Sequence, residues 1–197
     1  MPKSSKPKKP PIDKKAVTAK LERAQQDQLR VRVRRWIPDA DPVEGFVVGI
    51  GRRWVALAQL SDRILLDGWA LVRLKDIQAV KIYPDPNTFA TRALRLRSQW
   101  PPVAPPVDLD HTVAAITAAT KVAPLLTVHE EFARPDVCWI GMVRSVDDTT
   151  LALHEVDGEA NWLRKVTMID LDSITRLDMG GGYEEALHLV AGEPPKR

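Results

Sequence analysis

Cysteine, aromatic residues and long apolar runs are all scarce in this sequence. Cys138 is the only cysteine among 197 residues, which excludes an internal disulfide, and aromatic residues make up only 6%. No apolar run approaches the roughly 20 residues that a membrane-spanning helix needs. The charged start of the chain has no apolar stretch after it, as a secretory signal would. These features predict a cytoplasmic protein that makes no contact with a membrane.

Residue clusters typical of catalysis or metal binding are also missing. His129-Glu130-Glu131 begins like a metalloprotease motif, but the second histidine is absent and the setting is a strand. Cys138 lies beside Trp139-Ile140 in an apolar run, which favours a buried structural thiol over a reactive one. We therefore predict a protein that is not an enzyme, with no catalytic residue, no metal site and no cofactor.

Charge is distributed unevenly along the chain. Residues 1–35 hold 12 Lys/Arg and 3 Asp/Glu, for a net charge of +9. Residues 36–110 hold 9 of each sign, whereas residues 111–197 hold 8 Lys/Arg and 14 Asp/Glu, for a net charge of −6. A basic segment attracts phosphate without sequence specificity, so the tail predicts a contact with nucleic acid. The alternative is a solvated tail that touches the chain's own acidic part.

An internal repeat runs through the sequence with an offset of about 96 residues. Pro10-Pro11-Ile12-Asp13 recurs as Pro105-Pro106-Val107-Asp108, and Gly45-Phe46-Val47 recurs as Gly141-Met142-Val143. Further matches keep the same order, including Val55 and Leu57 with Leu151 and Leu153, and Ala93-Leu94-Arg95-Leu96 with Ala186-Leu187-His188-Leu189. The sequence therefore predicts two copies of one unit in tandem.

Each copy has the pattern of a helix, five short strands and a second helix. The apolar residues at helical spacing are Val17, Leu21 and Ala24; Phe89, Ala93 and Leu96; Val113 and Ile116; and Tyr183, Leu187 and Val190. Short runs rich in β-branched residues predict strands at Leu29–Trp36, Val43–Ile50, Trp54–Gln59, Trp69–Lys75, Ile77–Tyr83, Leu125–Glu131, Cys138–Val146, Thr150–Glu155, Leu163–Ile169 and Ile174–Met179. Residues 50–53 and 146–149, and the Asp-Gly pairs at 67–68 and 157–158, predict hairpin turns.

This order of elements predicts a β-rich α+β protein of two tandem five-stranded barrels, each flanked by an N-terminal and a C-terminal helix. So small a sheet must curl to cover its apolar face and its edges. The predicted domains are a basic disordered tail (1–12), a first helix–barrel–helix unit (13–98), a Pro-rich linker (99–107) and a second unit (108–197). The linker is expected to be stiff, and Trp100 and Val103 favour its packing against a barrel over recognition by a proline-binding domain.

The stretch Gly45–Leu57, followed by Leu74–Val80, resembles Sm-like and SH3-like small barrels, in which a glycine in the second strand permits strong bending. Gly141–Leu153 is similar in pattern, and Ile174–Leu187 resembles the carboxyl end of uncharacterised bacterial proteins of this barrel type. The resemblance implies a small barrel that acts as a binding module. It implies no RNA-contacting residues, since Gln59–Arg63 does not reproduce the loop motif of the RNA-binding members.

An arginine-rich strand lies next to the basic tail. Alternation along this strand places three arginines on one exposed face, which makes it the best candidate surface for nucleic acid. The candidate nucleic-acid-binding residues are Lys8, Lys9, Lys14, Lys15, Arg30, Arg32, Arg34 and Arg35.

Two functions remain open at this stage. The first is a non-enzymatic interaction or adaptor protein with a protein partner of unknown identity, because small barrels act as binding modules and the fold does not fix the ligand. The alternative is an RNA- or DNA-associated protein that uses the basic tail and the Arg30–Arg35 strand. The opposite charges of the two units suggest a division of labour or a docking of one unit on the other.

Overall fold

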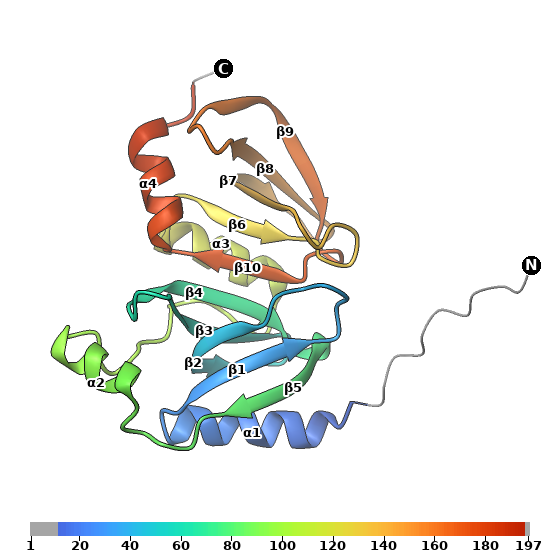
Figure 1. Cartoon of the computed structure of the whole chain (residues 1–197). Helices are drawn as coiled ribbons and strands as arrows, with labels where there is room; N and C mark the ends of the chain where they lie inside the picture. Colours follow the sequence, from blue (N-terminus) through green and yellow to red (C-terminus); the bar gives the residue numbers. More distant parts are fainter. Residues whose placement is uncertain (1–11, 196–197) are drawn as a thin grey trace, which may run out of the picture.

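A computed structural model describes residues 12–195 and shows ten β-strands and four α-helices (Figure 1). The helices are α1 (Lys14–Gln26), α2 (Phe89–Leu96), α3 (Thr112–Val122) and α4 (Gly182–Ala191), with a short 3-10 helix, η1, at Leu74–Asp76. The strands are β1 (Arg30–Arg35), β2 (Val43–Ile50), β3 (Trp54–Leu60), β4 (Leu66–Arg73), β5 (Ile77–Ile82), β6 (Leu126–His129), β7 (Cys138–Val146), β8 (Thr150–Val156), β9 (Trp162–Asp170) and β10 (Arg176–Met179). The elements thus lie close to the ranges that the sequence predicts.

All ten strands form one antiparallel sheet. Their order across the sheet is β5-β1-β2-β3-β4-β10-β6-β7-β8-β9. We call residues 12–98 the first half and residues 108–195 the second half. The two halves meet where β4 pairs with β10, with Ala70 opposite Asp178 and Leu71 opposite Leu177.

The prediction of two closed five-stranded barrels is wrong, because this sheet is open and continuous. β5 lies at one edge of the sheet beside β1, and β9 lies at the other edge beside β8. β4 obtains its second neighbour from the other half, so its backbone groups are paired without closure of either half.

The two halves share the same strand order and the same register. Gly45 pairs with Gln59 in the β2–β3 hairpin, and Gly141 pairs with Glu155 in the β7–β8 hairpin, a shift of 96 residues at both positions. A Cβ atom on either glycine would overlap a carbonyl oxygen of the facing strand, so both glycines permit a close approach. The repeat in the sequence therefore extends to the pairing of individual residues.

The two largest apolar cores lie on opposite faces of the sheet. On β4, Ala70 and Val72 belong to the core that α1 covers, whereas Leu71 between them belongs to the core that α3 covers. This second core combines Trp54 and Leu71 of the first half with residues such as Ile116 of the second half. The halves therefore share apolar burial across their junction.

The helices differ in how well the sequence predicts their buried side. On α1, the expected residues Val17, Leu21 and Ala24 are buried. The apolar faces predicted for α2 and α4 are wrong in part. Leu94 on α2 and Leu187 on α4 are the buried leucines, whereas the other large apolar residues of both helices face outward. No helix within residues 12–195 has the length and apolar character needed to cross a bilayer.

The Asp-Gly pairs have different roles in the two halves. The pair at 157–158 lies in the turn between β8 and β9, as predicted, but Asp67 and Gly68 lie inside β4. Gly68 has φ +69°, and a Cβ atom there would overlap the carbonyl oxygen of Met179 on β10. Asp67 accepts a hydrogen bond of 2.8 Å from the backbone N–H of Gly182 at the start of α4. This pair joins the halves rather than turning the chain.

The segment between the halves packs against the first half. The Trp100 ring meets the Phe46 ring edge-on with centroids 5.2 Å apart, and Trp69 Nε1 donates a hydrogen bond of 2.8 Å to the Val103 carbonyl. The predicted division into domains stays a prediction, and residues 1–11 of the predicted tail lie outside the described residues.

Candidate functional site

Three of the predicted arginines lie on the outer face of β1. Arg32 and Arg34 are exposed and Arg30 is half-buried, because the valines between them point into the core. On the edge strand β5, Lys81 is the direct partner of Arg32 in the strand pairing. We name this surface the arginine face and define it by Arg30, Arg32, Arg34, Lys81 and Tyr83.

The arginine face is an open cationic surface. The Arg30 guanidinium lies 3.9 Å from the centroid of the Tyr83 ring, and Lys81 Nζ lies 4.9 Å from it. Arg32 Nε is 3.5 Å from Glu44 Oε1, an exposed ion pair that neutralises part of the charge. A shallow hollow of about 570 Å³ follows the face, with Arg34 among its lining residues. Such a surface suits an extended polyanion rather than a small enclosed ligand.

The remaining predicted site residues do not all join this face. Arg35 is buried, and its guanidinium donates hydrogen bonds to both carboxylate oxygens of Glu131, so it does not join the arginine face. The reason is alternation, which turns Arg35 to the inner side of β1. Lys14 and Lys15 are exposed on the first turn of α1. Lys8 and Lys9 lie outside the described residues.

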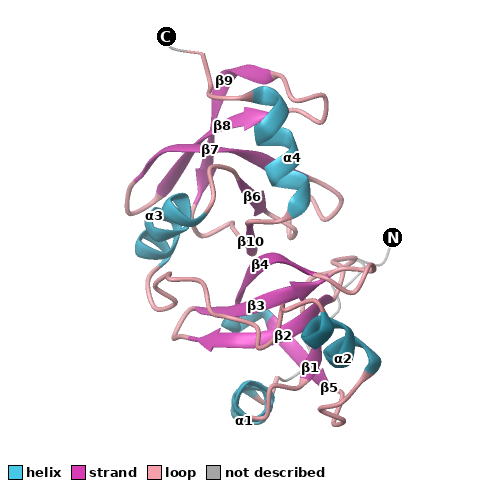
Figure 2. Ribbon diagram, turned by 90° about the vertical axis from the view of Figure 1, so that its left-hand side faces the viewer, coloured by secondary structure: helices cyan, strands magenta, loops and turns pink. Residues whose placement is uncertain are grey.

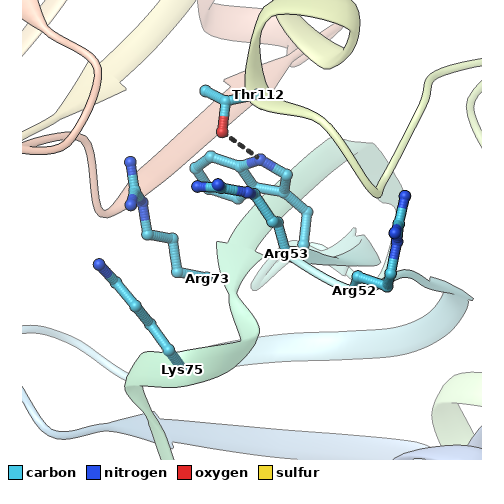
Figure 3. A pocket seen from close by; sticks show the side chains of 6 residues that line it. Arg52, Arg53, Arg73, Lys75 and Thr112 are labelled. Atoms are coloured by element: carbon cyan, nitrogen blue, oxygen red, sulfur yellow. Dashed lines mark hydrogen bonds between the residues drawn. The ribbon is translucent and has the colours of Figure 1, made fainter. Parts of the chain in front are cut away.

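A second cationic site, which the sequence pattern did not predict, lies beside the junction of the halves. It is a cavity of about 210 Å³ that we name the junction pocket, lined by Arg52, Arg53, Trp54, Arg73, Lys75 and Thr112. Figure 3 shows Arg73 and Lys75 on one side of the pocket, with Arg52 on the opposite side and pointing away from them. Four of these six lining residues are cationic and none of the six is acidic. The pocket is therefore suited to an anionic group.

Arg73 is the buried cation of the junction pocket. Its guanidinium donates a hydrogen bond to the Leu171 carbonyl, and Nε has no hydrogen-bond partner among the described residues. Burial lowers the pKa of Arg73, while the nearby carboxylates of Asp76 and Asp172 act in the opposite direction. A charge held with so little solvation interacts strongly with an incoming anion.

The start of α3 adds a further positive contribution to the pocket. Thr112 is the first residue of this helix, and the residue before it, His111, makes no side-chain hydrogen bond to the helix backbone. Thr112 Oγ1 accepts a hydrogen bond of 3.3 Å from Trp54 Nε1, which fixes the helix end against the pocket wall (Figure 3). The free N–H groups and the dipole of a helix N-terminus both favour an anion.

Acidic residues stand just outside the junction pocket. Asp172 Oδ1 lies 3.9 Å from Arg73 Nη1, and its side chain is largely exposed. A neighbouring hollow of about 370 Å³ has Arg53, Asp148 and Asp172 among its lining residues. These carboxylates reduce the positive potential on the side of the second half, so the attractive part of the pocket belongs to the first half.

The sequence holds a signal for this pocket in its repeat. Arg52-Arg53 predicts only a hairpin turn, and nothing in the local pattern brings that turn near Lys75. The register, however, aligns Arg52 with Asp148 and Lys75 with Asp172, at offsets of 96 and 97. Both turns are basic in the first copy and acidic in the second. This paired change of charge indicates a site that only the first copy has.

A buried charge network on β10 and β6 has a structural role. Asp178 accepts hydrogen bonds from Arg176 Nε at 2.7 Å and is 3.2 Å from His129 Nε2. Burial alone would raise the pKa of Asp178, but Arg176 and His129 outweigh it and hold the pKa below its usual range.

Cys138 is exposed rather than buried as predicted. Its thiol is still partly shielded from solvent, and this shielding together with the nearby Asp178 raises the pKa of the thiol, which disfavours the reactive thiolate. Within residues 12–195, no group of three or more His, Cys, Asp or Glu residues is arranged to hold a metal.

Comparisons with known protein families, with curated proteins and with solved structures found no match to this chain.

Proposed function

We propose that this protein is a non-enzymatic nucleic-acid-binding protein that holds a backbone phosphate in the junction pocket. The observation that carries this proposal is the cavity of about 210 Å³ in which Arg53, Arg73 and Lys75 meet the N-terminus of α3. A phosphodiester offers one negative charge and several acceptor oxygens in a small volume, which such a cluster of donors recognises.

The arginine face supports nucleic acid over a free phosphate ion as the ligand. It supplies exposed cations on Arg32, Arg34 and Lys81, apart from the junction pocket, and only a polymer of phosphates can use both surfaces. Arg32 and Arg34 stand two residues apart on one strand face, a spacing of roughly 7 Å, so that they can contact successive charged groups. RNA and DNA share this phosphodiester chemistry, and the experiment distinguishes them. A cytoplasmic location is part of the proposal.

The test is fluorescence anisotropy with labelled RNA and DNA single strands of about 16 nucleotides, measured at several salt concentrations between about 50 mM and 200 mM. We expect affinity to fall steeply with salt, because binding releases counterions. Replacing two pocket cations in the variant Arg53→Gln/Lys75→Gln should reduce the slope of log K against log salt by roughly 1.4, about 0.7 for each lost contact to a single strand.

The matched control is Lys121→Gln/Lys165→Gln, which removes two exposed positive charges of the second half away from the pocket. Its salt slope should equal that of the unchanged protein. Equal losses in the two double variants would show that only net charge matters, and absence of salt-sensitive binding would remove the proposal altogether. The variants Arg32→Gln/Arg34→Gln and Lys8→Gln/Lys9→Gln measure how much the arginine face and the tail each contribute to the binding affinity.

A protein-adaptor role is the second candidate function. Specific support for it comes from the large apolar side chains that α2 and α4 present to solvent, since exposed apolar residues grouped on one side favour contact with another protein. Purification of the tagged protein from its native cells, followed by mass identification of bound macromolecules, distinguishes nucleic acid from protein partners.

A further inference from the structure

The helices α2 and α4, which follow β5 and β10, both carry large apolar side chains that are exposed. On α2, Phe89 and Leu96 are 68% and 89% exposed, and on α4, Leu189 and Val190 are 85% and 75% exposed. On α2, Phe89 and Leu96 stand seven residues apart on one face of the helix, and on α4 the exposed Tyr183 and Val190 do the same, with Leu189 beside them. We call each of these exposed surfaces an apolar stripe. Grouped apolar residues of this kind mark an interaction surface more often than isolated ones do.

The stripes share one matching position of the repeat. Leu94 on α2 and Leu187 on α4 are the buried residues, and two positions later Leu96 and Leu189 are both exposed. Figures 1 and 2 both show α2 and α4 on the same side of the molecule, one on each half. A single partner that approaches from that side can therefore contact both helices.

The charges beside the two stripes are opposite. On α2, the exposed Arg92 lies one helical turn from Phe89 and from Leu96, and the first turn of this helix contains no acidic residue. On α4, the exposed Glu185 lies one turn from Leu189. The α2 stripe is thus flanked by positive charge and the α4 stripe by negative charge, so the two stripes complement each other.

We propose that two copies of this chain form a closed dimer in which α2 of each copy packs on α4 of the other. A two-fold axis brings each stripe against its complement, so the pairs α2–α4 and α4–α2 form together. Both helices lie on the same side, so one approach buries all four apolar stripes and leaves no open end for further growth. This dimer goes beyond the proposed nucleic-acid binding and does not depend on it.

Sedimentation velocity on the full chain without nucleic acid tests the dimer. We expect a species of twice the 22.0 kDa chain mass whose fraction rises with concentration. Leu96→Glu places a negative charge against the acidic α4 stripe, and Leu189→Lys places a positive charge against the basic α2 stripe. Each variant should raise the dimer dissociation constant at least about tenfold, as expected for a central apolar contact.

Both positions are highly exposed, so the monomer should keep its fold, which circular dichroism and the midpoint of urea unfolding verify. The matched control is Phe132→Glu, which places the same charge on an exposed apolar residue outside both helices and should leave the dissociation constant unchanged.

A charge exchange tests the pairing of the two stripes directly. Arg92→Glu alone and Glu185→Lys alone should each weaken the dimer, because each places like charges opposite one another. The double variant Arg92→Glu/Glu185→Lys reverses both charges and should restore the dissociation constant to within about threefold of its original value.

Three results would overturn the proposal. The first is a monomer at every concentration up to about 100 μM, a range in which even a weak specific interface forms. The second is a dimer that Leu96→Glu and Leu189→Lys leave intact, and the third is a double charge variant no better than the single ones. Monomeric protein that floats with lipid vesicles would assign the stripes to a membrane surface instead.

Discussion

The two halves have the same strand register but opposite charges at the same positions. In the first half, the β2–β3 turn and the end of β4 carry Arg52 and Arg73, whereas the second half has Asp148 and Asp170 at the matching places. The paired glycines and the bulges of the two hairpins nevertheless keep the same register in both halves. Scaffold and surface charge therefore vary independently in this molecule, and the proposed anion binding would belong to the first half.

Opposite charges at matching positions also occur in the interior. Arg35 and Glu131 stand 96 residues apart, the offset of the repeat, and they form a buried ion pair with each other. Thr175 Oγ1 donates a further hydrogen bond of 2.6 Å to the same carboxylate. Opposite charges in the two copies thus create a contact between the halves that two like charges could not form.

Removing one partner of this pair should have the largest effect. We expect Glu131→Gln to lower the free energy of unfolding by about 3–5 kcal/mol, because it leaves the buried Arg35 charge uncompensated. Urea denaturation measures the change. Glu44→Gln, which breaks the exposed pair with Arg32, should cost less than about 1 kcal/mol. Similar costs for the two variants would show that the buried pair has no special role in joining the halves.

The next effect concerns two matching positions on β5 and β10. Lys81 is exposed at the sheet edge, whereas Asp178 is buried because β10 lies beside β4. Asp178→Asn should lower the free energy of unfolding by about 3 kcal/mol near neutral pH, since it leaves Arg176 without its carboxylate. Lys81→Gln is the exposed counterpart and should change stability by less than about 0.5 kcal/mol.

The pH dependence of the Asp178 contribution has a defined sign. The pKa of Asp178 is lowered in the folded protein, so its stabilising effect is complete above the usual Asp pKa of about 3.9 and is lost as pH falls through the folded pKa. Urea unfolding at pH 7 and below pH 4 should therefore show the difference between Asp178→Asn and the unchanged protein shrinking with acid. A difference that stays constant over this range would contradict the lowered pKa.

Giving the second half the charges of the first should strengthen nucleic-acid binding. Asp148→Arg/Asp172→Lys removes two carboxylates beside the junction pocket and adds two cations at the matching positions. We expect affinity for a single strand to rise by about tenfold, or about 1.4 kcal/mol, and the salt slope to increase by roughly 1.4. Anisotropy titration measures both quantities. An unchanged slope would mean that phosphate does not approach these turns.

The smallest effect should come from the contact of Asp67 with the start of α4. Asp67→Ala removes the acceptor of the Gly182 N–H, and we expect a loss of about 1 kcal/mol, as for other helix N-terminal caps. The comparison variant Asp157→Ala removes the aspartate of the other Asp-Gly pair, whose carboxylate accepts hydrogen bonds from the backbone N–H groups of Asn161 and Glu159 within the β8–β9 hairpin. If Asp67→Ala lowers the melting temperature of α4 and of the sheet in one shared transition, Asp67 is a contact that joins the halves.

The local sequence pattern predicted the positions of the strands well, but the predicted closure of the sheet into two barrels was wrong. Val31 and Val33 alternate with arginines, and this alternation alone places Arg32 and Arg34 outside and Arg35 inside. The pairing of β4 with β10 depends on contacts such as Leu71 with Leu177, more than a hundred residues apart, and no local signal reports them. The same limit applies to the junction pocket, where Arg53 and Lys75 come from separate turns and α3 reaches them through the linker.

The linker determines how strong the contact between the halves has to be. β4 and β10 pair through four residues each, and the apolar core beside them includes residues of both halves. Because one chain carries both strands, their pairing is intramolecular, and the linker supplies an effective concentration that can reach the millimolar range. The segment that ends at Leu109 is itself held to the first half, since the Leu109 carbonyl accepts hydrogen bonds from the backbone N–H groups of Arg53 and Trp54. The tether is therefore short as well as covalent, and it presents α3 to the junction pocket in a single arrangement.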